Sequence, residues 1–175
     1  MRSNDAFHVA LAPLDGGRGG PTSVKLEIIS GVKGAREFVC FAIGDDQYGI
    51  DIMAVREIKE WSNVTCLPKQ PDYVRGVLNL RGVMVSIIDL RCRFGQGVTE
   101  ATPMHIVIVV QIEERLVGLL ADQVLDIVAF EAEKIQAVPK VAQASRIEFL
   151  SGLVTVDDNM IALIDLPGVL SFPAI

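Results

Sequence analysis

The sequence predicts an all-β chain made of two small, related barrels, and three observations support this. Half of the 175 residues are apolar but only 6% are aromatic, so the core is mainly aliphatic, and β-branched residues favour strands. Short apolar segments recur with turn residues between them, as in barrels or sandwiches. Two stretches also repeat in the same order along the chain, which indicates a duplicated unit.

Residues 1–35 are expected to form a flexible N-terminal extension, and residues 36–172 the folded domain. The run Gly16–Pro21 is rich in glycine and offers few side chains for packing. Beyond it, Val24–Ile28 alternates enough to predict one short strand.

The folded domain is predicted to open with a hairpin. A strand over Phe38–Ile43 is followed by turn residues at Gly44–Asp46 and a returning strand over Gln47–Ile50. Further strands are predicted at Glu57–Trp61, Gly76–Leu80, Val83–Leu90, His105–Ile112, Arg115–Leu119, Leu125–Phe130, Leu153–Val156 and Met160–Leu166. Short helical turns are predicted at Ile52–Arg56, Leu90–Phe94, Asp122–Val124 and Pro167–Ser171.

The internal repeat divides the domain into two similar units. Gly76–Leu90 aligns without a gap on Gly152–Leu166. Two earlier segments match as well, with Tyr48–Ile50 aligned on Val117–Leu119 and Val55–Ile58 aligned on Val124–Ile127. Because units of about 60 residues bury little surface alone, we expect two barrels that share a core or seal against each other. The first is expected mainly in residues 36–95 and the second mainly in 104–172, with shared elements.

Charge and hydropathy argue against nucleic acid and membrane insertion. Residues 1–35 carry a net charge of +1, residues 36–95 are neutral, and residues 96–175 carry −7, so the C-terminal half repels phosphate. Apolar runs such as Ile106–Val110 are far shorter than the roughly 20 residues that a spanning helix needs. No signal peptide is predicted. Cys40, Cys66 and Cys92 lie far apart, which fits reduced thiols rather than a disulfide or zinc site.

Candidates for catalysis are few, and we expect neither an enzyme nor a cofactor. His8 and His105 show no metal-ligand spacing. Asp89 and Asp165 occupy equivalent repeat positions and could be imagined as a carboxylate pair, but each follows an apolar run and more simply caps the next helical turn.

The strongest binding candidate is Arg81. The pair Arg81–Gly82 stands between two apolar strands, where a two-residue hairpin turn belongs. A rigid tip would hold the planar guanidinium ready to bind a carboxylate. The alternative is that any turn residue would serve there.

The combined motifs of residues 36–172 closely resemble the CheW chemotaxis coupling proteins. They are Gly44–Ile52, Val55–Ile58, Thr65–Pro68, Pro71–Gly76, Asn79–Gly82, Ile88–Arg91, Val117–Asp122 and Ile164–Leu166. The resemblance implies two intertwined SH3-like five-stranded barrels with a few short helices and without catalytic activity. It also implies a cytoplasmic adaptor, recruited to membrane receptor arrays, that links chemoreceptor tips to the CheW-like regulatory domain of the histidine kinase CheA.

The resemblance also suggests which residues bind partners. Arg81 and Glu57 match positions linked to receptor and kinase coupling, and the two are expected to pair with each other. Val55, Gly76 and Asn79 match positions at or near the receptor-binding groove, although core packing would equally explain Val55. Two alternatives stay open at this point: a sensory module that binds a small ligand between the barrels, and an adaptor of a non-flagellar pathway.

Overall fold

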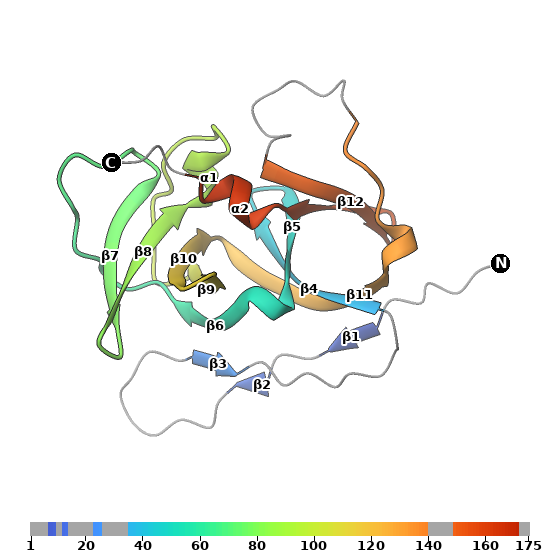
Figure 1. Cartoon of the computed structure of the whole chain (residues 1–175), viewed down its shortest axis with the longest axis horizontal. Helices are drawn as coiled ribbons and strands as arrows, with labels where there is room; N and C mark the ends of the chain where they lie inside the picture. Colours follow the sequence, from blue (N-terminus) through green and yellow to red (C-terminus); the bar gives the residue numbers. More distant parts are fainter. Residues whose placement is uncertain (1–6, 10–11, 14–22, 26–34, 140–148, 172–175) are drawn as a thin grey trace.

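The computed structural model describes residues 7–9, 12–13, 23–25, 35–139 and 149–171, and most of its regular structure is β-strand (Figure 1). The domain contains β4 (Ala35–Ile43), β5 (Asp46–Asp51), β6 (Val55–Glu60), β7 (Val74–Leu80), β8 (Val83–Asp89), β9 (Ile106–Ile112), β10 (Arg115–Ala121), β11 (Gln123–Glu131), β12 (Leu150–Val156) and β13 (Asn159–Ile164). The helical elements are α1 (Leu90–Arg93), α2 (Leu166–Val169) and the 3-10 turns η1 (Ile52–Ala54) and η2 (Ala132–Lys134). No helix in the described ranges is long and apolar enough to cross a membrane.

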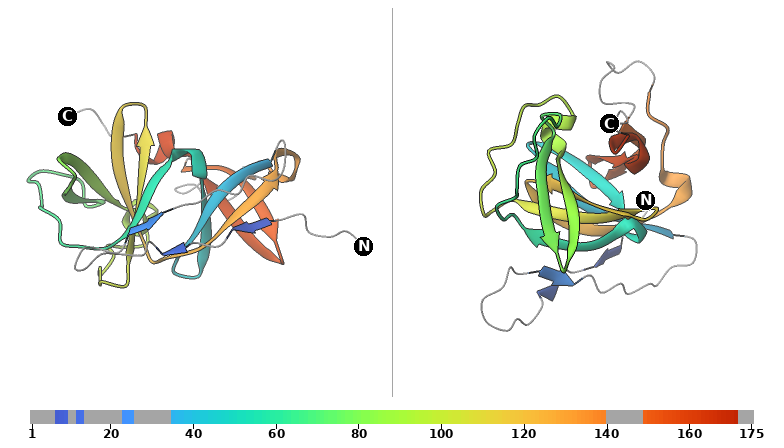
Figure 2. Two further views of the ribbon diagram at one scale, coloured as in Figure 1. Left: turned by 90° about the horizontal axis from the view of Figure 1, so that it is seen from below. Right: turned by 60° about the vertical axis from the view of Figure 1, so that its left-hand side comes forward.

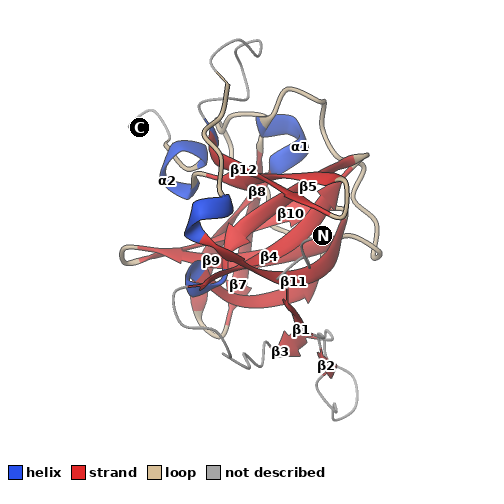
Figure 3. Ribbon diagram, turned by 90° about the vertical axis from the view of Figure 1, so that its right-hand side faces the viewer, coloured by secondary structure: helices blue, strands red, loops and turns tan. Residues whose placement is uncertain are grey.

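The domain strands form two five-stranded sheets with matching connectivity. Figure 3 shows the strands in red and the short helical elements in blue. One sheet has the order β11-β4-β5-β13-β12, and the other has the order β6-β9-β10-β8-β7. Each contains one parallel pair, in which Ala162 lies opposite Tyr48 and Gly118 lies opposite Ile87. The predictions of an all-β fold and of two related five-stranded units are therefore confirmed.

The strand order shows how the two units share the chain. We expected the first barrel mainly in residues 36–95 and the second mainly in 104–172, with shared elements. The shared elements are those of the first hairpin, because β4 and β5 join the C-terminal strands β11 to β13, while β6 to β10 form the other sheet. Because β5 pairs in parallel with β13, the first hairpin belongs to the same sheet as the C-terminal strands, and the two units are intertwined.

The central strands β4 and β9 are buried on both faces, which explains their continuous apolar sequences. On β4, Phe38 and Cys40 pack into one cluster, whereas the alternate residues Val39 and Phe41 pack into the largest cluster of the molecule. Strand β9 alternates in the same way between the largest cluster and a third one. Since side chains of a strand point alternately to its two faces, each central strand lies between two cores.

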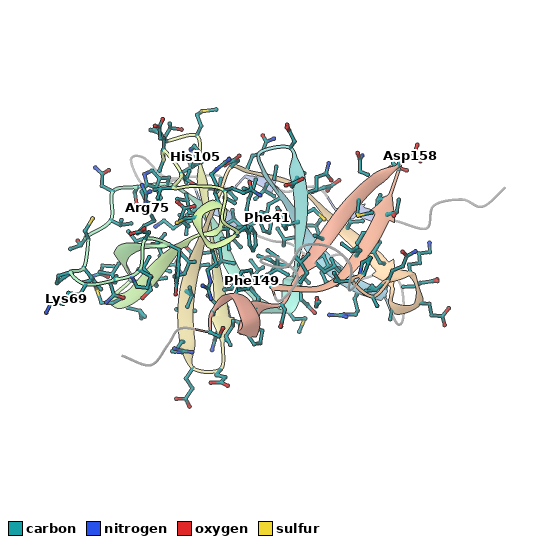
Figure 4. All side chains as sticks on the ribbon, turned by 90° about the horizontal axis from the view of Figure 1, so that it is seen from above. Phe41, Lys69, Arg75, His105, Phe149 and Asp158 are labelled. Carbon is teal, nitrogen blue, oxygen red and sulfur yellow. The ribbon has the colours of Figure 1, made fainter. Side chains whose placement is uncertain are left out.

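A row of aromatic rings runs through the largest cluster. The ring centroids lie 5.9 Å apart for Phe41 and Tyr48, 5.0 Å for Tyr48 and Phe94, and 5.9 Å for Phe94 and Phe149. Phe41 and Phe149 lie near the middle of the molecule in Figure 4. Because these residues come from distant parts of the chain, their packing joins the two units into one body.

Most predicted elements coincide with observed ones, but the prediction of a helical turn at Asp122–Val124 is wrong. Gln123 already begins β11, and the Asp122 N–H donates to the Ala42 carbonyl instead of opening a helix. The turn at η2 was not predicted. The alignments of the repeat also make its second copy seven residues longer in the middle, around residues 137–148, and this stretch lies largely outside the described residues.

The extension contributes three short strands, β1 (Phe7–Val9), β2 (Ala12–Pro13) and β3 (Ser23–Lys25), and two of them, β1 and β3, lie against the outer strands of the two sheets. β1 pairs with β11, and β3 pairs with β6 on one side and with β2 on the other. Figure 1 shows all three along the lower side of the molecule. The strand predicted at Val24–Ile28 overlaps β3, while residues 26–28 lie outside the described ranges.

Candidate partner-binding site

Arg81 and Gly82 form the two-residue turn between β7 and β8, as the sequence predicts. Their φ angles are 51° and 87°, and Leu80 lies opposite Val83 where the strands close. A tight hairpin turn of this kind needs positive φ at both central residues. The Asn79 Oδ1 atom accepts a hydrogen bond of 2.8 Å from the Gly82 N–H, so Asn79 holds the turn that presents Arg81.

Arg81 pairs with Glu57, which lies on β6. The Arg81 Nη2 atom is 3.2 Å from the Glu57 Oε2 atom, and the two side chains are 78% and 13% exposed. Strands β6 and β7 stand at opposite ends of the five-strand order, so this contact bridges the two edges of the sheet. An exposed pair of this kind adds only about 0–1 kcal/mol to stability, and the open guanidinium keeps donors for a partner.

Two apolar side chains that follow the turn are exposed, which sequence analysis missed. Val83 is 48% exposed and Met84 is 59% exposed. The hairpin tip therefore offers apolar surface next to a cation, a combination suited to a protein partner. The sequence could have indicated this exposure, because the two apolar residues come directly after a hairpin turn and therefore lie at the exposed end of the strand.

Val55 and Gly76 are buried. Val55 packs in the core, and Gly76 allows a neighbouring segment to approach its strand closely. Val55 is 7% exposed and belongs to the largest core cluster. Gly76 has a φ of 142°, and a Cβ added there would lie 2.3 Å from the Thr65 carbonyl oxygen. That close approach allows two hydrogen bonds between Thr65 and Val77, of 2.8 and 2.9 Å. The structure thus brings Arg81, Glu57 and Asn79 together and buries Val55 and Gly76.

Asp89 caps α1, as predicted, and also anchors the following loop. Its carboxylate accepts from the Cys92 N–H at 3.3 Å and, more closely, from the Thr99 N–H at 2.7 Å and the Thr99 hydroxyl at 2.6 Å. Arg75 lies 3.6 Å away and compensates the buried charge. Asp165 stands at the start of α2 but makes no side-chain capping bond, so that prediction is wrong.

A second charged cluster ties the β4–β5 turn to α1. The Asp122 carboxylate accepts from the Gly44 N–H at 2.7 Å and from Arg91 at 2.6 Å. Burial opposes ionisation of Asp122, but these hydrogen bonds outweigh it and hold the pKa of Asp122 below its ordinary value. The His105 Nδ1 atom accepts the Thr102 N–H, which leaves its Nε2 atom facing Asp122 at 3.5 Å.

The described residues contain no group of three metal-ligating side chains. The thiols of Cys40, Cys66 and Cys92 are free. Burial, with a smaller contribution from Asp126, raises the pKa of Cys40 to about 12. Burial is also the main reason why the pKa of Cys92 is raised.

A surface pocket of about 340 Å³ lies beside the β4–β5 and β12–β13 turns. Its apolar lining includes Tyr48, Phe94 and Met160, and its acidic lining includes Asp45 and Asp158. Figure 4 shows Asp158 at the tip of its hairpin, far from Arg75 and His105. Apart from Phe94, which follows α1, the lining comes from strands of one sheet and from their turns. The pocket is thus not the groove between barrels that a small-ligand sensor would use.

Comparisons with known proteins agree with this arrangement. The profile of the CheW-like domain family matches residues 37–173. The chain is 40% identical over 139 residues to the probable chemotaxis protein CheW of Rhizobium etli, covering 79% of this chain and 90% of that protein. It is 38% identical over 143 residues to the chemotaxis protein CheW of Klebsiella aerogenes, covering 82% and 86%.

A solved structure shows the same fold. The crystal structure of the scaffolding protein TtCheW from Thermoanaerobacter tengcongensis matches with a TM-score of 0.73 and 30% sequence identity, over 78% of this chain and 93% of that one. The family match, the identities and the shared fold lead to one conclusion: this chain belongs to the CheW-like domain family.

Proposed function

We propose that this chain is a non-enzymatic chemotaxis adaptor that couples transmembrane chemoreceptors to the histidine kinase CheA. Its partners are the CheW-like regulatory domain of that kinase and the cytoplasmic tips of the receptors, and it works in the cytoplasm at membrane receptor arrays. The proposal is supported by the family, whose named relatives are chemotaxis and scaffolding proteins.

The observation that carries the proposal is the exposed Arg81 on a rigid turn, paired with Glu57. A guanidinium held in a fixed orientation binds a carboxylate with little further loss of conformational freedom. Val83 and Met84 add exposed apolar surface at the same tip. We assign Arg81 and Glu57 to partner contact, Asn79 to the turn, and Val55 and Gly76 to the strands that carry the site.

The test is binding of the purified chain to the regulatory domain of a CheA kinase from the same organism, and to a receptor tip fragment. Arg81→Ala and Glu57→Ala should each weaken at least one interaction about tenfold or more, as expected for contact residues. Arg115→Ala is the matched control, because Arg115 is also an exposed arginine beside a hairpin turn. It should bind like the wild type.

The double variant R81E/E57R separates partner contact from stability. It reverses the pair and keeps the ionic contact, so a role limited to stability predicts normal binding. Partner contact predicts that binding stays weak although the protein is folded. No binding of the wild-type chain to either partner would overturn the adaptor proposal. The small-ligand alternative is not favoured, because the described pocket belongs mainly to one sheet.

A further inference from the structure

The pocket beside the β4–β5 and β12–β13 turns collects carboxylates from two distant parts of the chain. β5 and β13 pair in parallel, with Ala162 opposite Tyr48, so both strands begin at the same end of the sheet and the turns that precede them are neighbours. Asp45 and Asp158 come from these two turns, both are exposed, and both line the pocket of about 340 Å³. Strand pairing therefore places two acidic side chains around one cavity.

The acidic character of this pocket is not a requirement of the turns. The other half of the repeat has the same parallel pairing and the same two hairpin turns. The residues that stand there in place of Asp45, Asp46 and Asp158 are Glu114, Arg115 and Gly82. Their charges cancel, whereas the pocket has three carboxylates in its lining. The φ angles of Gly82 and Asp158 are 87° and 66°, so glycine would also serve in the turn at Asp158.

No cation in the described lining offsets these carboxylates. The described residues around the pocket include no lysine, arginine or histidine. Arg91 lies near the β4–β5 turn, but its Nη2 atom is 2.6 Å from the Asp122 Oδ2 atom, which neutralises it. The carboxylates of Asp45 and Asp158 are not hydrogen-bonded or ion-paired to any other described residue. A concave surface lined by one sign of charge attracts the opposite sign, so this pocket favours a cation.

The apolar part of the lining selects arginine among the cations. Tyr48 and Phe94 are nearly fully buried and their ring centroids lie 5.0 Å apart, so they form a fixed wall. Met160 is 61% exposed, and its flexible thioether adapts to what lies against it. An arginine packs its stem on apolar surface, and its planar guanidinium stacks on rings and offers five donors to carboxylates. A lysine offers a compact, strongly hydrated charge instead.

We propose that this pocket receives an arginine side chain from a protein partner, as a docking point separate from the Arg81 turn. Two exposed carboxylates hold a free small cation only weakly in water. A side chain delivered by a larger interface adds its contacts without a separate loss of translational freedom. In the left view of Figure 2, the red-orange strands β12 and β13 stand on the opposite side of the molecule from the green strands β7 and β8. A partner bound at the pocket therefore leaves the Arg81 turn open.

The test is an NMR titration of the nitrogen-15-labelled full chain, at low salt, with a capped tripeptide that has arginine between two alanines. We expect saturable shifts confined to the amide signals of residues 45–48 and 158–162, with a Kd on the order of 1 mM. The same peptide with citrulline, which lacks the positive charge, should cause no shift. The lysine peptide should bind about threefold or more weakly.

Acidic variants test the site itself. D45N/D158N should weaken binding of the arginine peptide about tenfold or more, and asparagine tolerates the positive φ at Asp158, so the fold is kept. E113Q/E114Q is the matched control, because it removes two exposed carboxylates from a turn of the other sheet. It should bind like the wild type. The proposal is overturned if no localised shift occurs, if the citrulline or lysine peptide binds equally well, or if D45N/D158N binds normally.

Other occupants of the pocket would give different results. Tighter binding of free L-arginine than of the capped peptide would assign the pocket to a small molecule. A wild-type dimer in sedimentation velocity that D45N/D158N abolishes would assign it to a second copy of this chain. If R146Q shifts the same amide signals without any peptide, the pocket belongs to an arginine of this chain, four positions before Leu150 in the sequence. Each of these three results would overturn the proposal.

Discussion

The replacement Gly76→Ala should strongly destabilise the fold, although it adds a single methyl group. The new Cβ would lie 2.3 Å from the Thr65 carbonyl oxygen, and the φ of 142° is one that side chains rarely adopt. The strained backbone costs about 1–3 kcal/mol, and moving Thr65 away breaks two hydrogen bonds with Val77, each of which stabilises by about 1 kcal/mol. The expected loss in the free energy of unfolding is therefore about 3–5 kcal/mol.

Urea denaturation followed by circular dichroism measures this loss, with Gly82→Ala as the matched control. Gly82 also has a positive φ, 87°, but nothing lies within 4 Å of a Cβ added there. The free energy of unfolding of Gly82→Ala should therefore fall only by the cost of conformational strain, about 1–2 kcal/mol. If Gly76→Ala costs no more than Gly82→Ala, the close approach to Thr65 is not what selects glycine.

Three other outcomes are expected from the same structure. Gly118→Ala should lower the free energy of unfolding, because the new Cβ would lie 2.5 Å from the Ile87 side chain; an unchanged denaturation midpoint would contradict this. At pH 8, a thiol reagent should modify the exposed Cys66 quickly and Cys40 only on unfolding, since Cys40 is buried and its pKa is about 12; equal rates in the native protein would refute the assignment. Asp122 has a lowered pKa in the folded state, so the stability it contributes is present above its ordinary pKa and is lost as pH falls through the folded value. Asp122→Asn should therefore reduce the acid dependence of stability in denaturation series between pH 2 and pH 5, and an unchanged slope would count against it.

Local chemistry explains which parts of the site were predictable. The turn at Arg81–Gly82 depends on residues next to each other in sequence, and the structure shows it with the expected positive φ angles. The cap at Asp89 is also local, and it is present. The equivalent Asp165 makes no side-chain capping bond, and the residues after it differ: Pro167, which has no backbone N–H, stands in the first turn of α2 where α1 has Arg91.

Contacts between distant residues were harder to predict. The Glu57–Arg81 pair was expected only because of the family resemblance, since spacing along the chain says nothing about two edges of a curved sheet. The helical turn expected at Asp122–Val124 is absent because the Asp122 N–H and carboxylate bind Ala42, Gly44 and Arg91. All three partners come from earlier elements that only the folded chain brings close.

The sequence by itself determined the strands, most turns and the duplication, because apolar alternation and turn residues act over a few positions. Only the tertiary structure decided that β4 and β5 cross to the C-terminal strands, and that β1 and β3 lie on the equivalent edges β11 and β6. The burial of apolar side chains determines which strands pair. β4 and β9 are apolar on both faces, so each must lie between two cores. Two separate barrels divided at the middle of the chain would not meet that requirement, whereas the intertwined arrangement does.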